Sequence, residues 1–294
     1  MCPLGEAEIN KRWRARDFIQ YNGSVKTMTD VFLFMRQGWN NIWKQNTIWL
    51  FGALPILFQL YSASQSKPVQ DLFGAFLSLV VLLILIILSL LNIIGVRYLA
   101  YCFSIGKPAN IQEAVSAVRK FSGRVIGCSC LGFLILSPCL LLILGISMDN
   151  TTQPPHISNT VTLMLLLLSI FDALLDFSFF GFFANDSGIR KNLKDAWALF
   201  TAHFAVLAIL GIILVIIFRI FSAAAGISTL LIQSGFDITA LSKLDYINPS
   251  MTLSRNILFV LINGLGQTIF SVFGASVFAM AYLKYSGIKM QRQS

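Results

Sequence analysis

The stretch LSLVVLLILIILSLLNIIG, residues 77–95, decides the fold class of this chain, because it carries no charged side chain over nineteen positions. The apolar run around it extends over residues 72–103. A helix of roughly 20 residues crosses a hydrocarbon core of about 30 Å, so this run is long enough to span a membrane with some tilt. The strands of membrane barrels are shorter and alternate in polarity, so the run predicts a transmembrane helix.

The composition of the whole chain favours the same fold class. Of its 294 residues, 56% are hydrophobic and only 12% are charged, and the mean hydropathy is +0.74. Soluble domains are usually about 25% charged. Pro55 and Pro138 are expected to kink the helices that contain them. We therefore predict an all-α integral membrane protein with six transmembrane helices, near residues 47–63, 72–103, 125–147, 159–184, 205–232 and 255–283.

Positive charge is distributed unequally among the segments that join these helices. Eighteen of the 22 lysine and arginine residues fall in the terminal segments and in the connections on the same side of the membrane. Segments rich in lysine and arginine stay in the cytoplasm, so both termini are predicted to be cytoplasmic. The net charge of +9 is then a topology signal and a source of attraction to anionic lipid head groups, and we expect no nucleic-acid partner.

Three polar stretches on the predicted cytoplasmic side share one pattern. They are VFLFMRQGWNNIWKQN (31–46), NIQEAVSAVRKFSGRV (110–125) and IRKNLKDAWALFTAHF (189–204). Apolar residues recur in them at steps of three and four, which is typical of amphipathic helices that lie at a membrane surface. Five aromatic side chains are expected to anchor these helices at the acyl boundary: Trp39, Trp43, Phe121, Trp197 and Phe200. The expected N-caps are Asp30, Asn110 and Ser187.

The spacing of the three stretches predicts an internal repeat, because Trp39, Val118 and Trp197 are each 79 residues apart. Each unit would consist of an interfacial amphipathic helix and a helical hairpin. All units enter the membrane from the same side, unlike the inverted repeats of many transporters. The expected ranges are a cytoplasmic N-terminal segment at 1–29, a membrane domain at 30–285 with repeats at approximately 30–108, 109–187 and 188–285, and a cytoplasmic tail at 286–294.

The basic amphipathic segment NLKDAWALFTAHF, followed by VLAILGIILVI, resembles a known family. It is similar to the bacterial multi-pass membrane domains related to the membrane domain of glycerophosphodiester phosphodiesterases, over roughly residues 30–285. In that family the membrane domain can be joined to a soluble catalytic barrel. This sequence has no such barrel, so the resemblance implies the fold and topology and no activity.

Two carboxylates lie inside the fourth apolar run, in FDALLDF at residues 171–177. Asp172 and Asp176 are one helical turn apart, and Arg219 lies at a comparable depth in the fifth run. An unpaired charge at the middle of a membrane costs about 2.5–3.5 kcal/mol on insertion scales, so we expect Arg219 to pair with Asp172 and to reach toward Asp176. The alternatives are an ion or proton pathway, because two carboxylates face one arginine, and recognition of a partner subunit or a polar ligand.

Other polar side chains within the predicted spans, Asn92, Asn263 and Gln267, are expected to form hydrogen bonds between helices. The sequence contains no metal-binding histidine or cysteine motif, no phosphate-binding glycine loop and no nucleophile elbow. We therefore expect no catalytic residues, no metal and no cofactor.

These features predict a non-enzymatic accessory or scaffold subunit of a membrane complex, located in the bacterial plasma membrane. Its expected partners are other membrane subunits and anionic lipids at the cytoplasmic face. Two alternatives remain open at this stage: a transporter or ion pathway that uses the intramembrane charges, and a protein that organises lipids.

Overall fold

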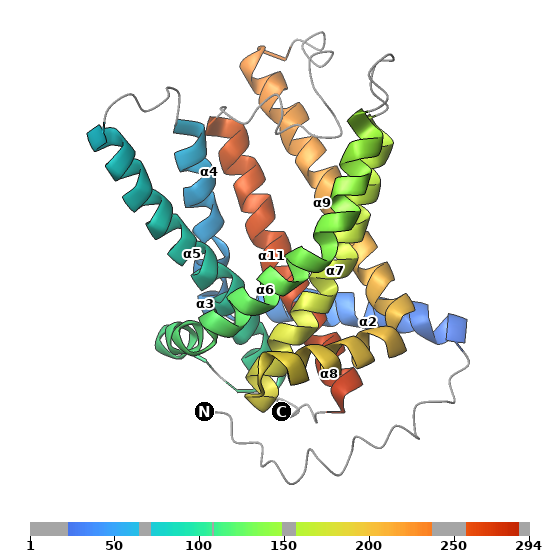
Figure 1. Ribbon diagram of the computed structural model, residues 1–294. Helices are drawn as coiled ribbons and strands as arrows, with labels where there is room; N and C mark the ends of the chain where they lie inside the picture. Colours follow the sequence, from blue (N-terminus) through green and yellow to red (C-terminus); the bar gives the residue numbers. More distant parts are fainter. Residues whose placement is uncertain (1–22, 65–71, 108, 149–156, 237–256, 288–294) are drawn as a thin grey trace.

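The computed structural model describes residues 23–64, 72–107, 109–148, 157–236 and 257–287, and within them the chain forms α-helices and no strands (Figure 1). The helices are α2 (Gly23–Ile42), α3 (Asn46–Gly52), α4 (Leu54–Ser64), α5 (Leu72–Ser104), α6 (Ile111–Met148), α7 (Ile157–Asn185), α8 (Ile189–Ala202), α9 (Phe204–Gln233) and α11 (Ile257–Ser286).

Two ends of the bundle differ in structure. At the end that we call basal, α2 and α8 lie across the long helices; the opposite end is called distal (Figure 1). Helices α4, α6 and α9 finish at the distal end, and α5, α7 and α11 return from it to the basal end. The long helices converge at the basal end, whereas α5 and α7 diverge toward the distal end.

Three helices are long and apolar enough to cross a membrane: residues Ser78–Ser104 of α5, all of α9 and all of α11. This agrees with the predicted class of all-α integral membrane protein. The distal part of α5 exposes large apolar side chains, including Phe76, Leu83 and Ile87. A surface of this kind is expected to face lipid.

Helix α6 differs from the prediction of an interfacial helix followed by a separate span. Both segments form one continuous helix, Ile111–Met148. Asn110 caps it as predicted, because the Glu113 backbone N–H donates to Asn110 Oδ1 at 2.9 Å. Pro138 lies inside the helix and has no N–H for the carbonyl of Leu134, but the Ser137 hydroxyl donates to that carbonyl at 3.0 Å.

The other two predicted N-caps are wrong. Helix α2 begins at Gly23, so Asp30 lies within it, where the carboxylate accepts hydrogen bonds from Lys284 Nζ at 2.6 Å and Tyr285 OH at 3.3 Å. Asp30 therefore forms an ion pair with α11 and does not cap α2. At α8 the N-cap is Gly188, with no side-chain cap, and the Ser187 hydroxyl lies 3.5 Å from Asn192 Oδ1 instead.

The first predicted span is divided into α3 and α4, and Pro55 explains the break. A helix through this point would need an N–H at position 55 to donate to the carbonyl of Phe51, and proline has none. Asn92 Nδ2 on α5 donates to that carbonyl at 2.8 Å. The predicted interhelical role of Asn92 is therefore present, and it compensates the backbone defect that Pro55 creates.

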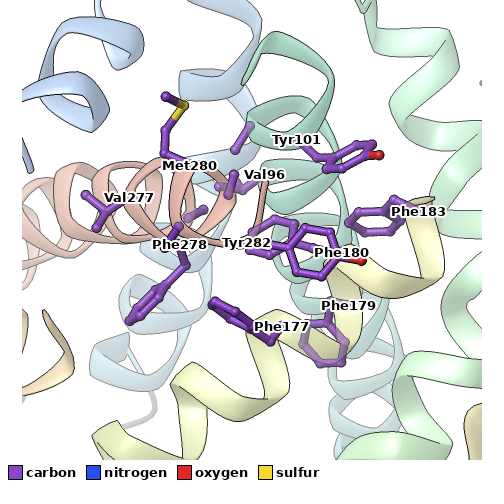
Figure 2. Packing of buried hydrophobic residues seen from close by; sticks show 14 of the residues in the cluster. Val96, Tyr101, Phe177, Phe179, Phe180, Phe183, Val277, Phe278, Met280 and Tyr282 are labelled. Carbon is purple, nitrogen blue, oxygen red and sulfur yellow. The ribbon is translucent and has the colours of Figure 1, made fainter. Parts of the chain in front are cut away.

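The core lies where α5, α7 and α11 meet (Figure 2). Tyr282 on α11 packs against Phe177 and Phe180 on α7, with ring centroids 5.6 and 5.9 Å apart, and Tyr101 on α5 stacks on Phe180. Helix α11 also packs against α2, α3, α4 and α9, so it is the central helix. At its crossing with α2, a Cβ on Gly38 would lie 2.6 Å from a methyl group of Val277, so only glycine permits this approach.

The three returning helices end in a similar way at the basal end. A residue with a left-handed backbone conformation follows each of them: Gly106 after α5, Asp186 after α7 and Gly287 after α11, with φ values of 77°, 49° and 71°. This conformation is common just after a helix and favours glycine, with asparagine and aspartate as the tolerated alternatives.

The compensation of Pro55 by Asn92 predicts coupling between the two residues. The Asn92→Leu variant should lower the free energy of unfolding by about 1–3 kcal/mol, because the Phe51 carbonyl loses its donor. In a Pro55→Ala background the loss should shrink, because residue 55 then supplies an N–H. Unfolding of the four proteins in detergent measures the coupling. Ser89→Ala, which removes a hydroxyl bonded only within α5, is the control; additive effects would contradict the prediction.

Candidate functional site

An ion pair inside the bundle joins α5 to α7. Arg97 Nε donates to Asp176 Oδ1, and the Asp176 side chain is 6% exposed while that of Arg97 is 20% exposed. Arg97 is about 10 Å from the basal end of α5 and Asp176 about 14 Å from the end of α7, at 1.5 Å per residue. Both charges therefore lie inside the helical layer and not in the connecting segments.

The surroundings hold the Arg97 guanidinium in place. Its Nη1 donates to the carbonyl of Ile93, one turn earlier on α5, at 3.3 Å. Its Cζ lies 5.5 Å from the centre of the Phe179 ring, which is within the range of a cation–π contact. Together, these two contacts hold the guanidinium in position beside Asp176 on α7.

Asp172 lies one turn from Asp176 along α7, toward the distal end; the residue has exposed surface, although the protein atoms packed around it desolvate its carboxylate. It interacts electrostatically with both Asp176 and Arg97, but it forms no salt bridge within the described residues. The local arrangement is thus two carboxylates near one guanidinium, with the first carboxylate paired and buried and the second on a residue with exposed surface.

The structure does not contain the predicted ion pair between Arg219 and these two carboxylates. Asp176 takes its ion pair from Arg97, so the pair locks α5 to α7, where the prediction joined α7 to α9. Arg219 lies on α9, partly buried, and no salt bridge joins it to Asp172 or Asp176. Helices α7 and α9 pack against each other as expected. Packing of two helices does not by itself bring a chosen pair of side chains together, because each helix turns only one face toward its neighbour.

Sequence reasoning assigned Arg97 to a cytoplasmic connection, because arginine near the end of an apolar run is usually a topology signal. One further signal was available. Arg97 and Asp176 are 79 residues apart, which is the spacing of the predicted repeat. Opposite charges at corresponding positions of successive units would have suggested a pair between the two returning helices.

Asn192 on α8 was also missed. It is 1% exposed, and its amide donates to the backbone carbonyl of Ser178 on α7. Gly181 makes this contact possible, because a Cβ there would clash with the Asn192 amide. A polar residue on an amphipathic helix is usually solvated, whereas Asn192 fixes α8 against α7.

The remaining polar residues of the prediction occupy different environments. Gln267 accepts a hydrogen bond from Gln59 Nε2 and so links α11 to α4, in the interhelical role expected of it. Asn263 is 5% exposed, and its Oδ1 has no hydrogen-bond partner within the described residues.

The five predicted interfacial anchors fall into two groups. Trp39, Trp43 and Trp197 are 46, 57 and 57% exposed, so their rings are available to a surrounding phase. The prediction is wrong for Phe121 and Phe200, which are buried in the protein and do not lie at its surface. Phe121 packs edge-on against Phe183 of α7, at 5.3 Å between ring centroids. Their helix faces turn toward the protein, and an apolar face that meets protein has the same sequence pattern as one that meets lipid.

A second charged cluster lies at the end of α7. The carboxylate of Asp186 accepts hydrogen bonds from Lys120 Nζ at 2.6 Å and from Arg124 Nη1 at 2.5 Å, both on α6. The hydrogen bond from Lys120 holds the pKa of the Asp186 carboxyl below its usual value of 3.8, and Arg124 adds to the effect. The left-handed residue after α7 therefore also attaches α6.

The chemistry open to the site is electrostatic. Within the described residues, no group of three or more histidine, cysteine or acidic side chains is arranged to hold a metal ion. The carboxylate of Asp172 can accept a hydrogen bond or form an ion pair with a group outside the bundle. The buried Arg97–Asp176 pair next to it is fixed in place, and its two charges nearly cancel.

Comparisons of this chain with protein-family models, with curated proteins and with solved structures return no match.

The Arg97–Asp176 pair predicts strong coupling between the two side chains. Removing one partner, as in Arg97→Met or Asp176→Leu, leaves an uncompensated buried charge and should lower the free energy of unfolding by about 3–5 kcal/mol. The double variant should recover most of this loss. Unfolding in detergent measures the cycle, and Arg219→Met with Asp176→Leu is the matched comparison, for which we expect additivity. Coupling of Asp176 to Arg219 and not to Arg97 would contradict the assignment.

The Asp186 cluster predicts a small acid-sensitive contribution to stability. Because the pKa of Asp186 is lower in the folded state than in the unfolded chain, the contribution is complete above about pH 4 and is lost as the pH falls through the folded pKa. The exposed pair should contribute less than about 1 kcal/mol. Asp186→Asn, which tolerates the same backbone conformation, should remove this acid-dependent part in pH-dependent unfolding at low salt. Asp195→Asn is the control, and an identical acid limb in wild type and Asp186→Asn would contradict the prediction.

Proposed function

We propose that this chain is a six-span protein of the bacterial plasma membrane, with both termini in the cytoplasm, that serves without catalysis as an accessory or scaffold subunit. Three helices that are long and apolar enough to cross a membrane support the location. The alternation of helix ends between the basal and distal ends supports six spans, because each hairpin would leave and return on the same side.

Two features favour the three-unit repeat. The ion pair between Arg97 and Asp176 joins positions separated by the repeat spacing of 79 residues. The left-handed residues Gly106, Asp186 and Gly287 follow the returning helix of each proposed unit. A common end for the returning helices is expected if the units descend from one ancestor. We also retain, as part of the proposal, a relation to the membrane domains that accompany glycerophosphodiester phosphodiesterases.

The observation that carries the proposed role is the carboxylate of Asp172, on a residue with exposed surface. Asp176, one turn away, already has the guanidinium of Arg97, so Asp172 has no salt bridge within the described residues. A charge at membrane depth that faces lipid costs about 2.5–3.5 kcal/mol on insertion scales, and such residues usually have a partner. A neighbouring subunit that presents a lysine, an arginine or a hydrogen-bond donor would remove this cost.

The position of Asp172 on α7 favours such a partner. Helices α5 and α7 are joined at the Arg97–Asp176 pair and diverge from it toward the distal end (Figure 1). Asp172 lies on the distal side of the pair, on one of the two diverging helices. A helix of a second protein that docks beside Asp172 would meet this carboxylate, which would set both its position and its orientation.

A second candidate function, an ion or proton pathway, draws on the same residues. Two carboxylates near one guanidinium can share a proton or hold a cation, and intramembrane acidic residues commonly act in proton relays. The two functions differ in what they require. A pathway needs Asp172 to titrate in the isolated protein, whereas a docking site needs it to contact another subunit.

Affinity purification from native membranes tests the accessory role. Wild type and Asp172→Glu should retain a defined set of membrane proteins in quantitative mass spectrometry. Asp172→Asn should retain them at least about tenfold less, since a loss of about 1.4 kcal/mol suffices for that change. Asp195→Asn, which removes a carboxylate from α8, should behave as wild type. Gel filtration and thermal unfolding of each variant verify the fold.

Flux measurements separate the two functions. Purified protein in liposomes should show proton and cation flux at the level of empty liposomes, in wild type and in the Asp172→Asn/Asp176→Asn variant alike. Wild-type flux above background that the double variant loses would replace the accessory role by the pathway. Retention of the same proteins by wild type and Asp172→Asn would also overturn the proposed docking role of Asp172.

A further inference from the structure

An apolar groove of about 490 Å³ lies between α2, α9 and α11. Three elements contribute its walls: α2 through Met35 and Trp39, α9 through Ile217 and Phe221, and α11 through Ile269, Phe270 and Phe273. Its size is in the range of pockets that hold one small ligand. Among the residues that the structure describes, no polar side chain lines it, so the ligand must present hydrocarbon to these walls.

The groove lies where α2 passes α9 and α11. Trp39 is edge-on to Phe273 at 5.7 Å between ring centroids, and its helix α2 lies across the bundle (Figure 1). Phe221 and Phe270 are 5.9 Å apart and line the walls on α9 and α11, which run along the bundle. Two walls of the groove therefore lie on helices that run in the direction that an acyl chain takes in a bilayer.

The orientation of α2 places a positive charge beside the groove. At about 100° per residue, Met35 and Trp39 are about 40° apart around the helix, and the exposed Phe32 extends this apolar arc to about 60°. The exposed Arg36 follows at about 100°, next to the arc. Arg36 is thus at the boundary between the apolar and polar faces.

This boundary is where the phosphate of a membrane lipid would lie. On interfacial helices, aromatic and aliphatic residues enter the acyl region while basic residues contact anionic head groups. The groove and Arg36 together match both ends of one molecule, which neither a peptide helix nor a purely apolar solute would do. A helix of a second chain would also be too wide for a space of this volume, because a helix with its side chains is about 10–12 Å across.

We infer that the groove between α2, α9 and α11 is a specific site for one anionic phospholipid, with an acyl chain along Met35, Ile217, Phe270 and Phe273 and its phosphate at Arg36. The site is independent of Asp172 and of the proposed accessory role, since it lies on other faces of the bundle. It assigns to the basic helix α2 a defined ligand in addition to its general attraction to the membrane surface.

Native mass spectrometry with dioleoyl phosphatidylglycerol as the probe tests the site. Ile217→Trp fills the groove from α9 and should reduce the retained lipid at least about tenfold. Ile216→Trp places the same bulk on the neighbouring position, which is 49% exposed outside the groove, and should stay within about twofold of wild type. Equal retention by the two variants would overturn the proposal.

A second pair of variants on α11 covers the case in which Ile217→Trp fails to fold. Ile269→Trp fills the groove from the other wall, and Leu265→Trp, at a residue 58% exposed outside the groove, is its control. We expect loss of lipid for the first and not for the second. Thermal unfolding of all four variants identifies those that fold.

The role of Arg36 is tested by head-group selectivity. Wild type should prefer dioleoyl phosphatidylglycerol to dioleoyl phosphatidylcholine, and Arg36→Gln should reduce this preference about fivefold. Arg190→Gln, at an exposed residue of α8, which contributes no described residue to the walls of the groove, should leave it unchanged. An equal loss for both variants would mean general surface attraction only and would overturn the site. So would a second copy of this chain, or another protein, that occupies the groove and excludes both lipids.

Discussion

A medium without water imposes one constraint on this fold: every polar group inside it needs a partner from the protein. The carbonyl of Phe51, freed by Pro55, takes the amide of Asn92 from another helix, and the carbonyl freed by Pro138 takes a hydroxyl from its own helix. The carboxylate of Asp176 takes the guanidinium of Arg97. Because two of these bonds cross between helices, the same interactions that satisfy polar groups also determine which helices are neighbours.

The structure divides its surface between two tasks. Toward the basal end, aromatic side chains of α5, α7 and α11 interlock, and three charged contacts join helices: Arg97 with Asp176 inside the bundle, Lys284 with Asp30, and Asp186 with α6. Toward the distal end, α5 exposes apolar side chains and diverges from α7. A closely packed basal end with helices that diverge toward the distal end suits a protein that offers surfaces to other membrane components. Asp172 lies on the distal side of the Arg97–Asp176 pair, where α5 and α7 begin to diverge.

Much of the helical layout could be predicted from the sequence, because long uncharged runs leave few alternatives to helices. The positions of α5, α7, α9 and α11 and the cap at Asn110 follow from local patterns. The charge pairing does not, since an arginine near the end of an apolar run has the same local signature whether it lies in a loop or inside the bundle. The burial of Phe121 and Phe200 could not be predicted from the sequence for a similar reason. Hydrophobicity alone does not distinguish a side chain that faces lipid from one that faces a neighbouring helix.

The central position of α11 bears on how the chain is assembled in a cell. This helix follows all the others in the sequence, yet it contacts α2, α3, α4, α5, α7 and α9. During synthesis, the earlier helices enter the bilayer before the element that joins them exists. Half-finished chains therefore hold Asp30 without Lys284 and expose the faces that α11 later covers. The bundle can therefore be completed only after α11 has been synthesised.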